Sequence, residues 1–429
     1  MSNKFEERVP WYKEICDYKK VVDKPGAQIF DGIKVIDLSY ANLSGDYTST
    51  FLAEFGAEAI RVETPEGDPF RAISRLGFID ANRNKFHITL NIQKDEGKDV
   101  FKKMATRADV LIETYKPGYL DSLGIGYRQL SQINPRLVYV GLCNYGQYGP
   151  LAKTTRPSSD IISQAMSGIT CETGEVPEPG IPEENQPWAV PTRQNCFLAW
   201  TGAAYFAFIG IMSALLWRTK SGKGQFIDVS PWEAARFCVP SIGYYYHTKY
   251  VKERIGTLDP AIQLYGFIRA KDGYIFAGAF SDRSWESFCD MACRPDLKEK
   301  YPTGADRRRE VLELGRKCEE YTKQFAAHEI RAKSLEWSKT HPAVVAGGVN
   351  TPMETYKDEA YHEEATLIKF RDPIHGEICI SRGAPKSSGP VQKIKWLARP
   401  VGADNEFVYS NWLGLTPKDL EVLKNKDVV

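Results

Sequence analysis

Residues 33–63, IKVIDLSYANLSGDYTSTFLAEFGAEAIRVE, contain a complete structural unit and predict the fold. The first segment, IKVIDL at 33–38, is an apolar run of strand length, and AIRVE at 59–63 is a second one. Between them, residues 45–55 place Phe51, Leu52 and Phe55 on one face of a helix. A strand, a helix and a strand in this order predict a parallel βαβ unit.

The same alternation continues along the chain. Further strands are expected at 87–92, 109–113 and 137–142, with helices at 95–106 and 127–133 between them. The pattern predicts an α/β fold with a Rossmann-like, doubly wound parallel sheet. Such sheets bind ligands beyond the carboxyl ends of their strands. The loop SYANLSG after the first strand lacks GxGxxG, so a dinucleotide site of the usual kind is not expected.

The length of 429 residues exceeds the roughly 250–300 at which one core stops growing, so more than one domain is expected. From residue 231 the composition changes to aromatic-rich helices, a strand pair at 264–268 and 274–280, and charged helices within 306–339. We expect a large Rossmann-like domain at 1–230 and a smaller α+β domain at 231–372. Residues 373–429 are expected to form a C-terminal segment that returns to the large domain.

Charge, cysteine content and the absence of certain motifs limit the classes of function that fit the chain. The chain has 56 basic and 55 acidic residues and a net charge of +1, which gives no electrostatic case for nucleic acid or an anionic membrane. Nine cysteines without a CxxC pair favour a reducing, cytoplasmic compartment. No spacing of histidines or cysteines predicts a metal site, and neither GxSxG nor a P-loop occurs. The charged N-terminus lacks the apolar core of a signal peptide.

Residues 194–217 carry no charge and are long enough to span a bilayer. A solitary transmembrane helix and a helix buried in a soluble core both fit them. Gly202, Gly210 and the polar residues at one end favour the buried helix, as does the mean hydropathy of −0.39 for the chain.

Several stretches together resemble the family III CoA-transferases, which include formyl-CoA and carnitine CoA-transferases and alpha-methylacyl-CoA racemases. The resemblance covers nearly the whole chain in the family's order. Its motifs are VIDLS at 35, LAEFGAEAIRVETPEGDPFR at 52, NRNK at 82, ADVLIETYKPGYLDSLGIGY at 108, INPRLVYVGLCNYGQYGP at 133, SDIISQAMSGI at 159, TKSGKGQFIDVS at 219, GAP at 383 and LKNKDVV at 423.

The resemblance implies a large domain completed by the C-terminal segment, a linked small domain, and an interlocked dimer. It also implies covalent chemistry on coenzyme A thioesters, which are substrates; no covalently bound cofactor is expected. A carboxylate attacks the donor thioester and forms an aspartyl anhydride, then an aspartyl-CoA thioester, from which CoA passes to the acceptor acid. A carboxylate is needed because the intermediate must be an activated acyl group that a second carboxylate can attack.

The family's nucleophilic Asp begins the apolar helix, ten residues before the glycine of a Gly-Ile pair. Counting back ten from Gly210 reaches Trp200, and no carboxylate lies between Glu184 and Asp228. The Trp indole N–H only donates a hydrogen bond and cannot form an anhydride. The resemblance therefore implies that this chain lacks the nucleophile, with Trp200 in its place.

The CoA contacts are also reduced, because Thr64, Gln93, Ser122 and Pro157 stand where the family often has cations. This loss weakens a phosphate site. Nearby Arg61, Arg71, Lys94, Lys116 and Arg156 either compensate or are ordinary solvated charges. The positions that the resemblance assigns to CoA binding are Leu43, Ser44, Thr64, Arg71, Leu90, Gln93, Thr114, Tyr115, Lys116, Ser122 and Arg156.

Asp160 matches a family position close to the reacting thioester and is the best surviving acid. The alternative, which the sequence favours, is that Asp160 is the N-cap of the helix IISQAMSGI. Ser159 and Trp200 replace the acid–base pair of the racemase branch, so proton abstraction beside a thioester is not expected.

These observations lead to three hypotheses. The first is a catalytically silent subunit of a heteromeric CoA-transferase, supporting a homologous catalytic subunit. The second is an active homodimeric transferase or isomerase that uses Asp160. The third is a non-enzymatic acyl-CoA-binding protein.

Overall fold

The computed structural model describes residues 28–429 apart from a few short gaps, at 154–155, 179, 240, 250, 252–253, 260–263, 364–366, 383–384 and 386–391. The N-terminal leader and the GAP motif at 383 lie wholly or partly outside the described residues. The chain divides into two compact units. Unit 1 comprises 1–167, 195–240 and 358–429, and unit 2 comprises 168–194 and 241–357. The sequence placed the boundaries at 230 and 372, whereas the units change at 240 and 357 and residues 168–194 belong to unit 2.

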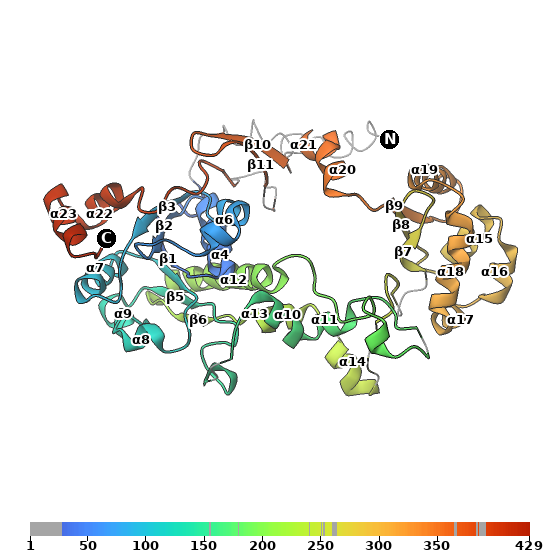
Figure 1. Cartoon of the computed structure of the whole chain (residues 1–429), viewed down its shortest axis with the longest axis horizontal. Helices are drawn as coiled ribbons and strands as arrows, with labels where there is room; N and C mark the ends of the chain where they lie inside the picture. Colours follow the sequence, from blue (N-terminus) through green and yellow to red (C-terminus); the bar gives the residue numbers. More distant parts are fainter. Residues whose placement is uncertain are drawn as a thin grey trace. The chain divides into compact units, whose positions relative to one another are not determined.

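A six-stranded parallel sheet forms the centre of unit 1 (Figure 1). Its strand order, β3-β2-β1-β4-β5-β6, confirms the predicted doubly wound α/β architecture. The order reverses between β1 and β4, which is where ligands bind in such sheets. The strands are β1 Lys34–Leu38, β2 Glu58–Glu63, β3 Lys85–Thr89, β4 Val110–Glu113, β5 Val138–Gly141 and β6 Phe226–Asp228.

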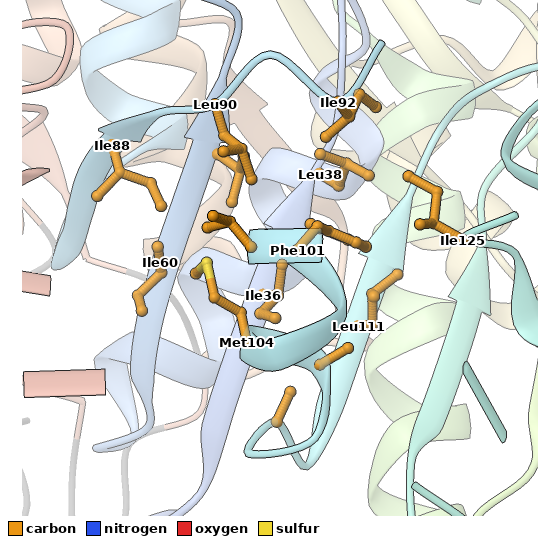
Figure 2. Packing of buried hydrophobic residues seen from close by; sticks show 14 of the residues in the cluster. Ile36, Leu38, Ile60, Ile88, Leu90, Ile92, Phe101, Met104, Leu111 and Ile125 are labelled. Carbon is orange, nitrogen blue, oxygen red and sulfur yellow. The ribbon is translucent and has the colours of Figure 1, made fainter. Parts of the chain in front are cut away.

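Successive residues of each strand face opposite sides of the sheet, and both sides are buried. On one side, Ile36 and Leu111 pack with α7 (Asp95–Ala105), and Figure 2 shows Phe101 and Met104 of this helix among the strand side chains. On the other side, Val35 and Val110 pack with helices α4 and α12. These elements are α4 Leu43–Glu54 and α12 Leu198–Ser221.

Helix α12 contains the long apolar stretch. By length and composition it is the one helix within the described residues that passes as a candidate membrane span. Small residues recur on its buried side, including Ala203, Ala207 and Ala214, and they let the helix lie close to β5 and β6. Its buried side is therefore a core element of unit 1, as the sequence favoured. α10 and α13 pack against it.

The C-terminal residues 405–429 extend the first face of the sheet. α22 packs on β3, and the Tyr409 hydroxyl donates to the Thr89 carbonyl at 2.6 Å. Val408, Tyr409 and Trp412 join the same core as α7. The remaining helices and strands of unit 1 are α5 Phe70–Ile73, α6 Arg75–Ala81, α8 Tyr119–Ser122, α9 Tyr127–Ile133, η1 Leu151–Lys153, α10 Asp160–Ser167, α13 Pro231–Phe237, α21 Glu359–Glu363, β10 Leu367–Asp372, β11 Gly376–Ser381, α22 Asn405–Leu413 and α23 Pro417–Asn425.

Replacing Tyr409 by Phe is expected to lower the free energy of unfolding by about 1 kcal/mol, because it removes one buried hydrogen bond and keeps the ring. Urea unfolding of the full chain measures the effect. Tyr148→Phe, at a side chain that is 78% exposed, is the matched control and should change nothing measurable.

Unit 2 has its own three-stranded antiparallel sheet, in the order β7-β8-β9. Trp285, Phe288 and Cys289 of α15 are buried against this sheet, and Ser281 caps the helix by accepting from the Ser284 N–H. The elements of unit 2 are α11 Ile169–Glu172, η2 Glu183–Asn185, α14 Ser241–Thr248, β7 Tyr265–Arg269, β8 Tyr274–Gly278, α15 Asp282–Met291, α16 Pro295–Lys300, α17 Gly304–Arg309, α18 Val311–Thr322, α19 Ala327–Trp337, β9 Val345–Gly348 and α20 Pro352–Lys357.

Candidate functional site

Trp200 lies in the first turn of α12 and is 6% exposed. Its ring stacks on Phe197 at 5.4 Å between centroids and meets the edge of Phe70 at 5.7 Å. The indole Nε1–H donates to Asn144 Oδ1 at 3.1 Å. The position that the resemblance gives to the nucleophile is therefore filled by a packed, hydrogen-bonded side chain with no nucleophilic atom.

Asp160 is buried and directed at the same turn of α12. Its Oδ1 accepts from the Trp200 backbone N–H at 2.9 Å, and its Oδ2 accepts from Gln164 Nε2 at 2.6 Å. The backbone N–H groups at a helix start have no partner within the helix, so Asp160 satisfies one of them from a neighbouring helix. A carboxylate at this end also interacts favourably with the helix dipole.

The prediction that Asp160 is the N-cap of its own helix is wrong in detail. α10 begins at Asp160, and the Ser159 hydroxyl accepts from the Ile162 N–H at 3.5 Å. Asp160 instead caps α12, a contact between residues 40 apart in sequence. Asp160 therefore has the capping role that the sequence favoured, but it caps α12 and not α10.

A buried charge network lies beside this region, beneath α4. Arg61 is fully buried and contacts three aspartates: Nη1 donates to Asp37 at 3.2 Å, Nη2 donates to Asp68 at 2.7 Å, and Nε lies 3.3 Å from Asp46. Lys85 is also fully buried and donates to Asp37 Oδ2 at 3.0 Å. Two cations thus face three carboxylates.

The carboxyl groups of the network differ in pKa. Burial would raise the pKa of Asp37, but Lys85 and Arg61 outweigh it and hold that pKa well below its ordinary value. Burial raises the pKa of Asp46 to about 7, against attraction from Arg61 and Lys85. Neither oxygen of Asp46 has a hydrogen-bond partner within the described part of the chain. Asp46 is therefore the carboxyl that holds a proton near neutral pH.

Four of the predicted CoA-binding residues, Thr64, Leu90, Gln93 and Tyr115, line one cavity of about 410 Å³. It lies at the carboxyl ends of β1, β2 and β3 and beside the loop after β4. Tyr115 is stacked between Tyr40, at 6.1 Å, and Tyr119, at 5.1 Å. Among the described residues the lining includes carboxylates but no lysine, arginine or histidine, and those carboxylates are Glu63, Glu66 and Asp68.

The other predicted positions do not meet at this cavity. Leu43 and Ser44 are buried in the first turn of α4, where the Ser44 hydroxyl donates to Asn42 Oδ1. Thr114 accepts from the Tyr40 N–H. Arg71 forms a two-pronged ion pair with Glu63 at 2.6 and 2.7 Å, so its charge is already paired.

Three further positions lie toward the solvent. Lys116 lines a second cavity, on the side of β4 and β5. Ser122 and Arg156 are exposed, and the Ser122 hydroxyl donates to the Tyr119 carbonyl. Lys94, considered as a substitute cation, lies 3.4 Å from Asp427. CoA binding by the predicted residues stays a prediction.

The buried network and the Asp160 contact were not found from the sequence. The signal for the network was present, because Asp37, Arg61 and Lys85 are charged residues inside or at the edge of otherwise apolar strands. Charges placed there must pair with one another when the strands are buried. Their partners depend on strand order, which the sequence did not give.

Comparison with known proteins identifies the chain. Residues 30–405 match the family model for CoA-transferase family III. Succinyl-CoA–D-citramalate CoA-transferase of Chloroflexus aurantiacus is 29% identical, with 93% of this chain and 98% of that protein covered. The succinyl-CoA–L-malate CoA-transferase beta subunit of the same organism is also 29% identical, with 93% and 97% covered.

A solved structure agrees with these matches. The crystal structure of a CAIB/BAIF family protein from Brucella suis superimposes with a TM-score of 0.76 at 26% identity, and 90% of this chain and all of that chain are covered. The chain belongs to CoA-transferase family III.

Proposed function

We propose that the chain is the catalytically silent subunit of a heteromeric CoA-transferase. Its partner is a homologous subunit that carries the nucleophilic carboxylate, and the two assemble as a heterodimer or heterotetramer of interlocked chains in the cytoplasm. The observation that carries the proposal is the buried indole of Trp200, at the position that the resemblance assigns to the nucleophile.

The contacts of Asp160 support this proposal over an active homodimer. A nucleophilic carboxylate needs an oxygen that can reach the thioester carbon. Both oxygens of Asp160 already accept hydrogen bonds, and one of these bonds supports the start of α12. The 4% exposure of the residue leaves little access for a thioester.

The exposed side of α12 supports assembly with a partner. Tyr205, Ile209, Met212 and Leu216 follow one another at spacings of four, three and four, and each is more than a third exposed within this chain. Contiguous exposed apolar residues mark protein interfaces in soluble proteins.

For the substrates, we propose succinyl-CoA as donor and an organic acid such as benzylsuccinate as acceptor, with this chain most like the non-catalytic subunit of succinyl-CoA:(R)-benzylsuccinate CoA-transferase. Two relatives that cover nearly the whole chain are named as succinyl-CoA transferases, and one of these is a beta subunit. Their names support the donor and a multi-subunit arrangement.

The test is CoA transfer from succinyl-CoA to benzylsuccinate by the chain alone and by the chain co-expressed with an Asp-bearing homologue. Activity is expected only in the complex, and partner Asp→Asn should lower it by a factor of about 10³ or more. A homodimer of this chain that matches the rate of the complex would overturn the proposal. Calorimetry with CoA separates an inactive subunit that binds CoA from one that does not.

Asp160→Asn distinguishes the two enzyme hypotheses. We expect stability to fall by about 1–3 kcal/mol, because Asn keeps one acceptor but loses the charge at the start of α12. The rate of the complex should change less than about threefold, since a residue that does not react contributes little to the transition state. Recovery of an Asp160 peptide modified by hydroxylamine after incubation with acyl-CoA would instead establish Asp160 as the nucleophile.

A further inference from the structure

The second cavity of unit 1 contains one of the predicted CoA-binding residues, Lys116, and none of the other ten. It has a volume of about 460 Å³, within the range of small-molecule sites. Residues that follow β4 and β5 line it, together with side chains of β5, β6 and α9. It lies on the side of the sheet that carries α9, whereas Trp200 packs in a different core.

One wall of the cavity is aromatic. Tyr127 of α9 lies 5.7 Å from Tyr139 and 5.4 Å from Phe226, measured between ring centroids. Tyr139 and Phe226 lie 5.7 Å apart on neighbouring strands. The three rings pack against one another at tilted angles and together present an apolar wall on which a ring or acyl chain packs favourably.

The cavity also contains a buried acid, Glu113, at the end of β4. Its oxygens accept from the Tyr115 N–H at 2.6 Å and from Gln147 Nε2 at 2.9 Å. The Gln147 backbone N–H donates to Asp228 at 2.8 Å, so one glutamine joins two acids on nearby strands. Burial raises the pKa of Glu113 to about 8, which leaves it neutral near pH 7. It therefore adds no negative charge to the cavity.

Besides Glu113, the cavity lining carries two basic residues and one acidic residue. Lys116 and Arg128 are exposed, and the described contacts include no ion pair for either side chain. Asp121 also lines the cavity, so two basic side chains stand against one acidic side chain besides Glu113. A guanidinium matches the geometry of a carboxylate and binds it with two parallel hydrogen bonds.

From these three features we infer that the cavity of Glu113, Lys116, Arg128, Tyr127, Tyr139 and Phe226 binds an organic carboxylate with an aromatic body, at a site separate from the start of α12. The body packs on the aromatic wall, and the carboxylate lies toward Lys116 and Arg128. The site is independent of whether this chain is catalytically silent.

The inference is tested by measuring the binding of 4-phenylbutyrate to the full chain, with calorimetry or ligand-detected NMR. A dissociation constant on the order of 0.1–1 mM is expected for a ligand of this size. The uncharged analogue 4-phenylbutyramide should bind at least about fivefold more weakly, because it cannot pair with the two cations. Inorganic phosphate should not compete, since it has no body for the aromatic wall.

Two variants locate the site. Lys116→Gln with Arg128→Gln should weaken binding of 4-phenylbutyrate by about tenfold or more, and Tyr127→Leu by about fivefold. The matched control is Lys103→Gln with Arg107→Gln, which removes the same charge from exposed positions in and just after α7 that do not line the cavity. Circular dichroism of each variant checks that the fold is kept.

Three outcomes would overturn the inference. They are no measurable binding by the unaltered chain, equal weakening in the control pair, and full displacement of 4-phenylbutyrate by saturating CoA. Displacement by CoA would show that 4-phenylbutyrate binds where CoA binds. None of them depends on the presence of a partner subunit or on transferase activity.

Discussion

Arg61→Met is expected to lower the free energy of unfolding of the chain by about 3–5 kcal/mol. Arg61 is completely buried and is in contact with Asp37, Asp46 and Asp68. Methionine has a similar length but no charge, so within the described residues Asp37 would keep its ion pair with Lys85, whereas Asp46 and Asp68 would lose theirs. Removing one partner from a buried ion network costs more than the network contributes, because the remaining charges stay desolvated.

Urea unfolding at pH 7 measures this loss. Arg107→Met makes the same substitution at an exposed position of unit 1, and it should change stability by less than about 0.5 kcal/mol. If both variants unfold at the same urea concentration as the unaltered chain, the network is not essential to stability.

Asp46→Asn tests the protonation of the network. The pKa of Asp46 is raised from 3.8 to about 7, so between these values the folded chain holds a proton that the unfolded chain has released. The contribution of Asp46 to stability is thus greatest below pH 4 and is lost as pH rises to about 7. Asparagine has no such proton, so the stability of the unaltered chain relative to Asp46→Asn should fall over this window. A constant difference from pH 4 to 7 would contradict the raised pKa.

The sheet was predictable because its strands are short apolar runs separated by amphipathic helices. The 33–63 stretch became β1, α4 and β2 within two residues at each boundary. Strand β3 ends at Thr89, earlier than the expected 92, because residues 90–93 turn away to line the first cavity. The apolar pattern does not reveal where the strand ends, because Leu90 and Ile92 are buried although they lie beyond it.

Side-chain contacts between residues far apart in the sequence could not be predicted in the same way. Arg71 looked like an available cation for a phosphate, yet Glu63 and His87 occupy it. Asp160 looked like a cap of the helix that follows it, yet it reaches a helix start 40 residues later. Both outcomes depend on which elements are neighbours in space. The same reason explains why the eleven predicted CoA positions separated into buried, paired, cavity-lining and exposed groups.

Trp200→Ala is expected to lower the free energy of unfolding by about 3–5 kcal/mol, through loss of a large buried side chain and the cavity left behind. Trp200→Phe is the matched control. It retains a ring beside Phe70 and Phe197 but loses the Nε1–H donor to Asn144 and the smaller ring of the indole, at a cost of about 1–2 kcal/mol. Equal losses in the two variants would show that the hydrogen bond, not the packing, holds this turn.

Trp200→Asp tests whether a carboxylate at this position is enough to give CoA transfer, or whether the position is only structural in this chain. A carboxylate here would replace the indole among Leu43, Phe70 and Phe197, where apolar side chains surround it. Burial without a paired cation disfavours the ionised form that a nucleophile requires. We therefore expect no CoA transfer by Trp200→Asp alone, measured as succinyl-CoA consumed, together with a stability loss at least as large as that of Trp200→Ala. Activity gained by this single substitution would mean that the surrounding site is intact for catalysis and that the chain differs from an active subunit at one residue.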